Sequence, residues 1–226
     1  MVPMNGRNAL VSAVILNWNG GDLVLRCQAT LGRQTYPDLE AIVVDNGSTD
    51  GSLERLRESK PTPRVVQNQT NLGFAVAANQ GIAASAGDWI LLLNQDVELE
   101  PDYVARLVAA GSAETTIGSV TGKLIRLRDG TQNVIDSTGH VLHRNGWVTN
   151  RGEDSPDLGQ YEQPGEVFGV TAAAALYRTC RRGGETVRKL IDCLIAATAI
   201  RSGVAVLHAD ADFDTLARQT ELRIAT

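Results

Sequence analysis

The chain has 226 residues, enough for one α/β domain with a sizeable core, or for one domain and part of another. Hydrophobic residues make up 43% of it, charged residues 21%, and the formal net charge is −5. This balance argues against an extended surface that coats nucleic acid or membrane. Because no apolar run reaches about 18 residues and the N-terminus lacks a signal-peptide pattern, we expect a cytoplasmic protein without a membrane span.

Three cysteines, Cys27, Cys180 and Cys193, lie far apart and in unlike sequence contexts. None of their spacings suits a metal site or a redox motif. We therefore expect free, buried thiols in a reducing cytosol.

Strands and helices are predicted to alternate between residues 10 and 94. Short β-rich runs indicate strands at Leu10–Trp18, Glu40–Asn46, Arg64–Gln69 and Asp88–Asn94. The segments between them indicate helices at Asp22–Gln34, Leu53–Ser59 and Phe74–Gly87. Asp22 is placed to cap the first of these helices. Such alternation predicts a parallel sheet with helices on both faces.

Polar side chains gather where these predicted strands end. Asn17, Trp18 and Asn19 end the first strand, Asp45 and Asn46 the second, and Asn94, Gln95 and Asp96 the fourth. Ligands of open α/β sheets bind outside the carboxyl ends of the strands, where loops and helix N-termini converge. Any one of these acids could instead be a helix cap or a turn former. Their coincidence at three strand ends favours a binding site.

The segment "LLLNQDVELEPDYV" places Asp96 in a loop just past a buried strand and before a helix that Pro101 starts. A carboxylate there can hold a hard divalent cation, which needs only one or two protein carboxylates when phosphate oxygens supply its other ligands. A nucleoside diphosphate would suit such a site. The alternative is that Asp96, Glu98 and Glu100 form a solvated acidic loop.

Five motifs, "VILNWNG", "VVDNGSTDGS", "NLGFAVAANQGI", "ILLLNQDVELEPDYV" and "VFGVTAAAALYR", occur in the order typical of family 2 glycosyltransferases. The resemblance covers residues 10–178 and is greatest to the rhamnosyltransferase-like members that build bacterial cell-surface polysaccharides. It implies a GT-A, Rossmann-like nucleotide-sugar-binding domain over residues 1–178.

The resemblance also implies roles for individual residues. Base and ribose contacts fall on Asn19 and Asp45, with Asn17 and Ser48 nearby. Asp96 matches the metal ligand of the DxD-like motif, here "NQD", with Asn94 in place of the first Asp. Asn71, Gly73 and Asn79 match a segment beside the sugar nucleotide. Val76–Ala78 departs from the Gly and Asn that family members commonly carry there.

The implied activity is transfer of a sugar from a UDP- or dTDP-sugar to a glycan or lipid-linked acceptor, with Mg²⁺ or Mn²⁺. Such an acceptor is compatible with a location at the inner face of the membrane. The expected acidic motif with a nearby Arg, where the catalytic base of inverting members resides, is missing after Arg178. The acceptor-side acids are Glu153, Asp154, Asp157, Glu162 and Glu166, none in a recognisable base motif. We therefore name no base and expect impaired catalysis.

Residues 181–226 resemble the C-terminal part of VapC-type PIN-domain ribonucleases. The segment "DCLIAATAIRSGVAVLHADADFDTLAR" carries this resemblance, which maps site acids to Asp192 and Asp210, with Asp212 adjacent. Alternatively, Asp192 faces solvent and the later acids cap a helix. The strand and helix that supply the family's other acids have no counterpart upstream, so residues 179–226 are predicted to be a partial PIN-like α/β fragment.

Three functions therefore compete at this point. The first is a truncated family 2 glycosyltransferase, the second a metal-dependent, toxin-like ribonuclease, and the third a catalytically inactive nucleotide-sugar binder. Nucleic acid is not an expected partner of the first.

Overall fold

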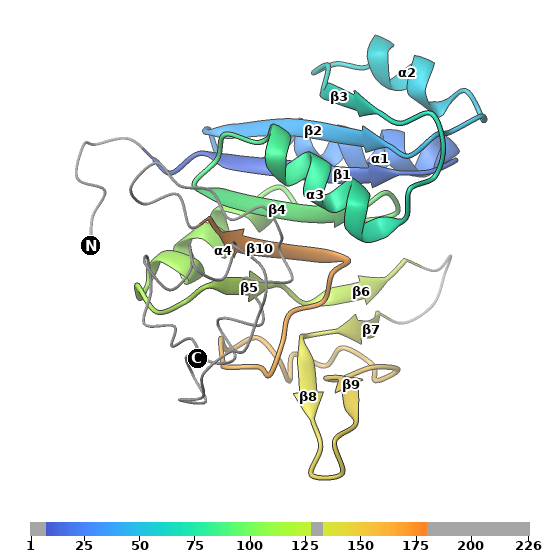
Figure 1. Ribbon diagram of the computed structural model, residues 1–226. Coiled ribbons are helices and arrows are strands. Elements are labelled where there is room, and N and C mark those ends of the chain that lie inside the picture. Colours follow the sequence, from blue (N-terminus) through green and yellow to red (C-terminus); the bar gives the residue numbers. More distant parts are fainter. Residues whose placement is uncertain (1–7, 128–132, 180–226) are drawn as a thin grey trace, which may run out of the picture.

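The computed structural model describes residues 8–127 and 133–179. The predictions made for Cys180, Cys193, Asp192, Asp210 and Asp212 lie outside these residues. Its main feature is a six-stranded sheet with the strand order β3-β2-β1-β4-β10-β5 (Figure 1). The six strands are β1 (Val11–Asn17), β2 (Leu39–Asp45), β3 (Arg64–Gln67), β4 (Trp89–Asn94), β5 (Ser119–Thr121) and β10 (Ala174–Arg178).

The first four strands form the predicted parallel sheet. β1 pairs with β2 on one side and with β4 on the other, and β3 extends the sheet beyond β2. The strand order therefore reverses between β1 and β4, which makes the carboxyl end of this pair a topological switch point. The rest of the sheet lies outside that prediction, and there β10 pairs antiparallel with both β4 and β5.

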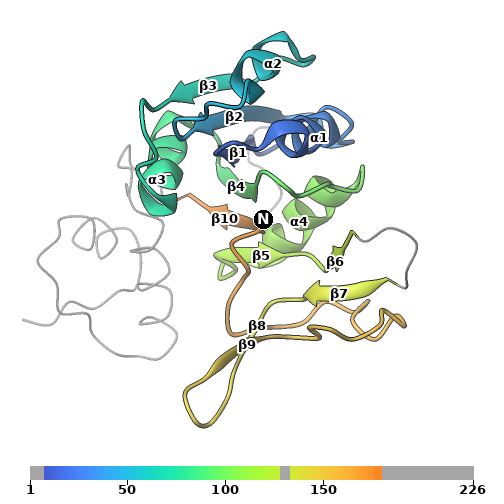
Figure 2. The ribbon, with the colours of Figure 1, turned by 90° about the vertical axis from the view of Figure 1, so that its right-hand side faces the viewer.

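Helices cover both faces of the sheet (Figure 2). They are α1 (Gly21–Leu31), α2 (Ser52–Glu58), α3 (Phe74–Ala84) and α4 (Tyr103–Ser112). Ile15 of β1 packs in one buried cluster with side chains of α1, α2 and α4. Its neighbour Val14 packs in a second cluster with α3. This alternation between faces is the period of a strand buried on both sides.

Helix α3 lies very close to the sheet, because Gly81 has no side chain. A Cβ added to Gly81 would approach Val14 Cγ1 to 2.2 Å and Val44 Cγ2 to 3.1 Å. The small residues Ala77 and Ala78 of the same helix are also buried. The small-residue composition of α3 thus brings its N-terminus close to the strand ends.

The predicted cap of the first helix is wrong. Helix α1 starts after Gly20, and Asp22 lies in its first turn without a side-chain cap hydrogen bond. Asp22 instead pairs with Arg55 at 2.5 Å. The backbone N–H of Gly21 donates to Asp50 Oδ2 at 2.8 Å, so a carboxylate from the loop before α2 supports the start of α1.

Two small two-stranded sheets lie below the main sheet in Figure 1. One pairs β6 (Leu124–Arg126) with β7 (Val134–Ser137), and the other pairs β8 (His140–Leu142) with β9 (Val148–Asn150). Within residues 8–127 and 133–179, no helix has the length and apolar character to cross a bilayer.

Candidate functional site

A pocket of about 270 Å³ opens at the carboxyl ends of β1 and β4. Its position is the switch point of the parallel sheet, where the first and fourth predicted strand ends meet. The lining residues come from the end of β1, the loop after β2, the start of α3 and the end of β4: Leu16, Asn17, Trp18, Asn46, Asn71, Phe74, Ala77, Asn94, Gln95 and Asp96.

Asn17 is the polar residue that joins the strand ends at this pocket. It is buried and donates through Nδ2 to Asp45 Oδ1 at 2.8 Å, and lies 3.1 Å from the hydroxyl oxygens of Ser48 and Ser52. Asp45 has no exposed surface and also accepts a hydrogen bond from Ser48 N at 3.2 Å. Asp45 and Ser48 therefore lie behind the lining and hold Asn17 and the loop after β2 in place.

The loop after β1 is hydrogen-bonded to the loop after β2. Asn19 has a left-handed backbone conformation with φ of 50°, a region in which Asn is one of the better-tolerated residues. Its backbone N–H donates to Ser48 Oγ at 2.9 Å, and its Oδ1 accepts from Thr49 N at 2.8 Å. Asn19 is exposed but is not among the lining residues.

A second amide network fixes the start of α3. Asn46 Nδ2 donates to Asn71 Oδ1 at 2.8 Å, and Asn46 Oδ1 accepts from Leu72 N at 2.9 Å. Gly73, with φ of 84°, donates its N–H to Asn71 Oδ1 at 2.8 Å. These contacts place Phe74 at the pocket, whereas Asn79 lies further along α3 and is not part of the lining.

Gln95 joins the ends of β1 and β4. Its Oε1 accepts from Trp18 N at 2.7 Å, and its Nε2 donates to Trp18 O at 3.3 Å. The loop that carries Asp96 is thereby attached to the loop that carries Trp18. Trp18 itself is 54% exposed and Phe74 49% exposed, so two aromatic rings border the opening.

Asp96 is the exposed carboxylate of the pocket. In the described part of the chain, no group of three or more His, Cys, Asp or Glu residues could hold a metal ion unaided. The chemistry of the lining, one carboxylate with the amide oxygens of neighbouring residues, fits a Mg²⁺ or Mn²⁺ ion that takes most of its ligands from phosphates and water.

Cys27 lies beneath this loop and takes no part in ligand chemistry. It is free and buried, as predicted, and its Sγ–H donates to Asn94 O at 3.6 Å. Burial, together with the negative charges of Asp96 and Glu98, raises the pKa of the Cys27 thiol to about 12. A thiol held protonated in this way is neither a nucleophile nor a metal ligand.

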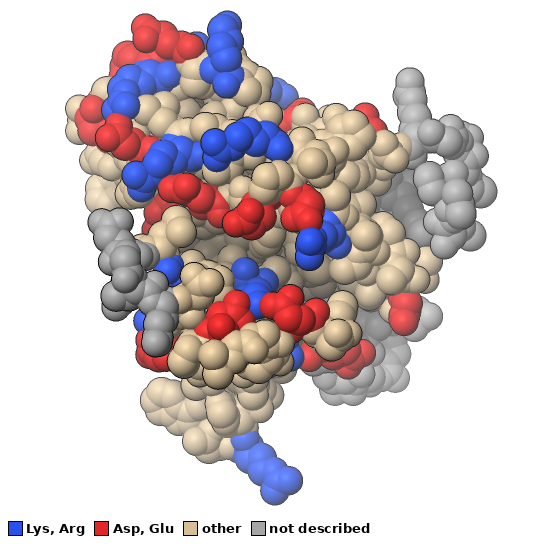
Figure 3. All heavy atoms as spheres, turned by 180° about the vertical axis from the view of Figure 1, so that it is seen from behind, with Lys and Arg blue, Asp and Glu red and all other residues tan. Residues whose placement is uncertain are grey.

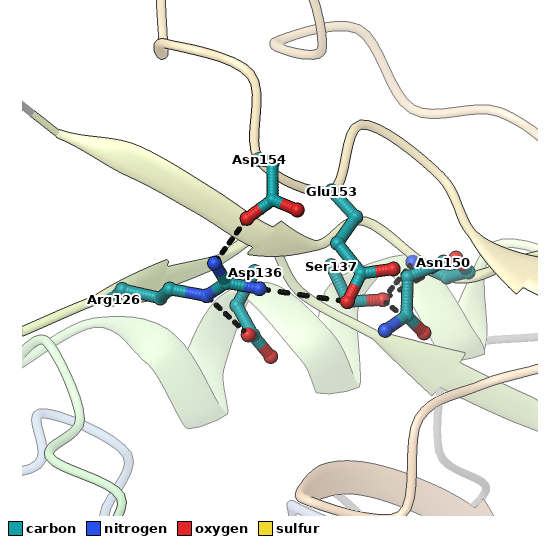
Figure 4. A network of polar contacts seen from close by, with 7 residues as sticks. Arg126, Asp136, Ser137, Asn150, Glu153 and Asp154 are labelled. Atoms are coloured by element: carbon teal, nitrogen blue, oxygen red, sulfur yellow. Dashed lines mark hydrogen bonds and ion pairs between the residues drawn. The ribbon is translucent and has the colours of Figure 1, made fainter.

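Four of the five acids in the region predicted to face the acceptor, all except Glu166, are held in ion pairs. Figure 4 shows those of Arg126. Arg126 at the end of β6 contacts Asp136 at 2.9 Å, Glu153 at 3.5 Å, and Asp154. Lys123 contacts Asp157 at 2.7 Å, and Glu162. The hydrogen bond from Lys123 lowers the pKa of Asp157. Seen from behind, the molecule has a hollow with acidic side chains on both sides of it (Figure 3).

Of the predicted site residues, Asn17, Asn71, Asn94 and Asp96 come together in the pocket lining. Asn19, Asp45, Ser48, Gly73 and Asn79 do not line it. Sequence reasoning assigned no ligand role to Trp18 and did not select Phe74. The sequence does contain a signal for Trp18 as a ligand contact. It is an aromatic residue directly after a buried strand, and the register of that strand exposes it.

Comparison with known proteins gives two kinds of match. The model of the family "Glycosyl transferase family 2" matches residues 12–179. The N-acetylglucosaminyl-diphospho-decaprenol L-rhamnosyltransferase of Mycobacterium tuberculosis is 30% identical over 133 residues, which is 54% of this chain and 43% of that protein. The uncharacterized glycosyltransferase YibD of Escherichia coli is 37% identical over 108 residues, 46% of this chain and 31% of that protein.

A different match is to ribonuclease VapC11 of Mycobacterium tuberculosis, 60% identical over 55 residues, or 24% of this chain and 41% of that protein. The chain spans less than half the length of each of these relatives. Among solved structures, mannosyltransferase PcManGT from Pyrobaculum calidifontis, in complex with GDP-Man and Mn²⁺, is 26% identical with a TM-score of 0.49. That match covers 55% of this chain and 38% of that one.

Proposed function

The chain belongs to glycosyl transferase family 2, whose model matches residues 12–179, and we propose that it transfers a sugar from a nucleoside-diphosphate sugar to a glycan or lipid-linked acceptor. The α/β fold of GT-A type predicted for this part of the chain is confirmed. The observation that carries the proposal is the pocket at the switch point between β1 and β4, which combines aromatic, amide and carboxylate side chains.

The pocket composition supports a nucleotide-sugar donor, either a UDP- or a dTDP-sugar. The exposed rings of Trp18 and Phe74 offer apolar surface to a base or sugar ring. The amides of Asn17, Asn46 and Asn71 are ordered by hydrogen bonds within the protein, so little conformational entropy is lost when a ligand binds beside them.

Asp96 would hold the divalent ion together with the donor's phosphates. When bound, Mg²⁺ or Mn²⁺ offsets the negative charge that grows on the departing diphosphate as the glycosidic bond breaks. The two hydrogen bonds between Gln95 and the Trp18 backbone keep the Asp96 loop at the pocket without a ligand. The protein thus contributes a positioned carboxylate rather than a complete metal site.

The acceptor would approach from the side of β6 and β7. We place the protein in cell-surface polysaccharide synthesis. The Mycobacterium tuberculosis relative is named for a lipid-linked acceptor, which supports this class of acceptor. Arg126 forms ion pairs with Glu153 and Asp154, and Lys123 forms ion pairs with Asp157 and Glu162. A general base needs a carboxylate available to accept a proton, so we assign this role to none of them.

Isothermal titration calorimetry with UDP- and dTDP-sugars, with and without Mn²⁺, tests the proposal. We expect saturable binding of one nucleotide class that strengthens with Mn²⁺. Release of radiolabelled sugar from the donor then separates an enzyme from an inactive binder. Absence of nucleotide-sugar binding under all these conditions would contradict the proposal.

The match to VapC11 supports a second candidate, a metal-dependent ribonuclease that uses Asp192 and Asp210. We expect no specific RNA cleavage, because these acids with Asp212 supply about half of the carboxylates that such a site needs. Incubation of the full chain with RNA and Mg²⁺ or Mn²⁺ tests this. Cleavage that disappears in Asp192→Asn would make the nuclease the leading function.

A further inference from the structure

The hairpin of β8 and β9 projects from the body of the molecule (Figures 1 and 2). Its strands pair antiparallel from His140↔Asn150 to Leu142↔Val148. All eight residues from Leu142 to Thr149 are exposed. The hairpin lies away from the donor pocket, and none of its residues lines that pocket. A role of this hairpin is therefore independent of the proposed sugar transfer.

The free end of this hairpin carries large apolar side chains in solvent. Trp147 is 72% exposed, and the cross-strand partners Leu142 and Val148 are 48% and 47% exposed. By contrast, Trp89 in the main sheet is only 2% exposed. Leu142 and Val148 stand opposite each other and Trp147 directly precedes Val148, so three large exposed apolar residues are concentrated at one tip. In soluble proteins such a concentration indicates an interaction surface.

The tip is held in one conformation by its own hydrogen bonds. His143 N donates to Trp147 O at 2.8 Å, and Gly146, with φ of 83°, donates to His143 O at 2.9 Å. Asn145 Oδ1 accepts from Trp147 N at 3.1 Å, and the His143 ring contacts Thr149 Oγ1 at 2.8 Å. The apolar side chains are thus presented by an ordered turn.

The charge of the hairpin is opposite to that of the chain. Residues 138–151 contain Arg144 and Arg151 and no Asp or Glu, although the whole chain has a net charge of −5. Arg151 points to the body, where it donates to Thr138 and lies 5.1 Å from the Tyr161 ring. Arg144 is exposed in the turn. Figure 3 shows basic and no acidic side chains at the free end of the projection.

We propose that the β8–β9 hairpin is a membrane-docking element that inserts Trp147, Leu142 and Val148 into an anionic lipid surface. Tryptophan prefers the boundary between hydrocarbon and water, where its ring is apolar and its N–H stays solvated. Arg144 would pair with lipid phosphate, which attracts basic residues near the surface. Because the acidic body is repelled by such lipids, the docking depends on this one projection and orients the molecule.

Co-sedimentation of the full chain with vesicles tests the proposal. Vesicles of phosphatidylglycerol and phosphatidylcholine in equal amounts are compared with vesicles of phosphatidylcholine alone. We expect binding to the anionic vesicles, weakened about tenfold or more in Trp147→Ser, because a large interfacial anchor is lost. Arg144→Glu should weaken it about tenfold as well, since a charge is reversed at the lipid surface.

Matched control variants distinguish binding through the hairpin from nonspecific hydrophobic or electrostatic binding. Leu158→Ser removes an apolar side chain that is 84% exposed elsewhere, and Arg33→Glu reverses an exposed charge just after α1. Both should bind the vesicles as the parent chain does. Trp147→Ser should keep the parent melting temperature, because the ring it removes is largely in solvent.

Three results would overturn the proposal. The first is no binding to the anionic vesicles, and the second is equal weakening by the hairpin and control variants. The third is a dimer, measured by light scattering without lipid, that dissociates in Trp147→Ser, because the patch would then serve a second copy of the chain. A blue shift of tryptophan emission with vesicles, lost in Trp147→Phe, is expected if the ring enters lipid.

Discussion

Asn17 and Asp45 are register partners at the ends of β1 and β2, and Asn17 Nδ2 donates to Asp45 Oδ1 over 2.8 Å. Both side chains are buried, Asp45 completely. The carboxylate also accepts from Ser48 N, so one buried acid orders both a lining amide and the loop after β2. The two residues are 28 positions apart, and only the parallel register brings them together.

Asp45→Ala is therefore expected to destabilise the fold. It leaves Asn17 Nδ2 and Ser48 N with one acceptor fewer in a buried setting, which costs about 1–3 kcal/mol in the free energy of unfolding. Urea unfolding followed by circular dichroism measures this. The exposed Asp38→Ala is the matched control and should leave the midpoint unchanged. An Asp45→Ala protein as stable as its parent that has lost nucleotide binding would instead indicate a direct ligand contact.

Asp96→Asn is expected to weaken the Mn²⁺-dependent part of nucleotide-sugar binding while leaving the fold intact. The change removes the one exposed carboxylate of the pocket and keeps its shape. Where turnover is measurable, a loss of about 10²-fold or more is the scale for removing an electrostatic stabiliser of the transition state. Calorimetry with and without Mn²⁺ checks this, with Glu100→Gln as the control. Unchanged Mn²⁺ dependence would remove Asp96 from the metal role.

The parallel half of the sheet could be predicted from the sequence, because each strand is a short apolar run that ends in polar residues. The predicted strand Leu10–Trp18 is observed as Val11–Asn17, and Asp88–Asn94 as Trp89–Asn94. The place of β10 could not be predicted in this way. Ala174–Arg178 enters the sheet between β4 and β5 through partners that are 81–89 and 54–58 residues away in sequence, which no local pattern encodes.

The candidate site also has a part that the sequence predicts and a part that it does not. The convergence of Asn17, Asn94 and Asp96 follows from the rule that ligands bind at the carboxyl ends of parallel strands. Phe74 could not be selected, because an apolar residue at the start of a helix resembles any core residue in sequence. Its exposure depends on the Asn46 and Asn71 amides, which set where α3 begins.

Gly81→Ala is expected to destabilise the protein through overpacking. Its Cβ would lie 2.2 Å from Val14 Cγ1, so helix α3 must move away from the sheet or Val14 must change rotamer. Such insertions cost about 1–3 kcal/mol. Gly118→Ala is the matched control, because nothing lies within 4 Å of its added Cβ and its φ is not positive. Thermal melts that shift equally for both variants would contradict the close packing of α3.

The carboxylate of Asp50 should contribute a pH-dependent part of the stability. Desolvation opposes its ionisation, but hydrogen bonds from the Ser52 hydroxyl, Ser52 N and Gly21 N outweigh it and lower the pKa of Asp50 from 3.8. A group with a lower pKa in the folded state stabilises the fold fully above the unfolded value and loses that effect as the pH falls through the folded value.

The free energies of unfolding of the parent and Asp50→Asn should therefore differ most near neutral pH. The difference should shrink as the pH falls below about 4, where the parent carboxyl also becomes neutral. Urea unfolding at several pH values measures it, and taking the difference removes the acid sensitivity of all other groups. Asp38→Asn, at an exposed acid outside this hydrogen-bond network, is the matched control. A gap between parent and Asp50→Asn that stays constant down to acid pH would mean that the charge of Asp50 does not support the start of α1.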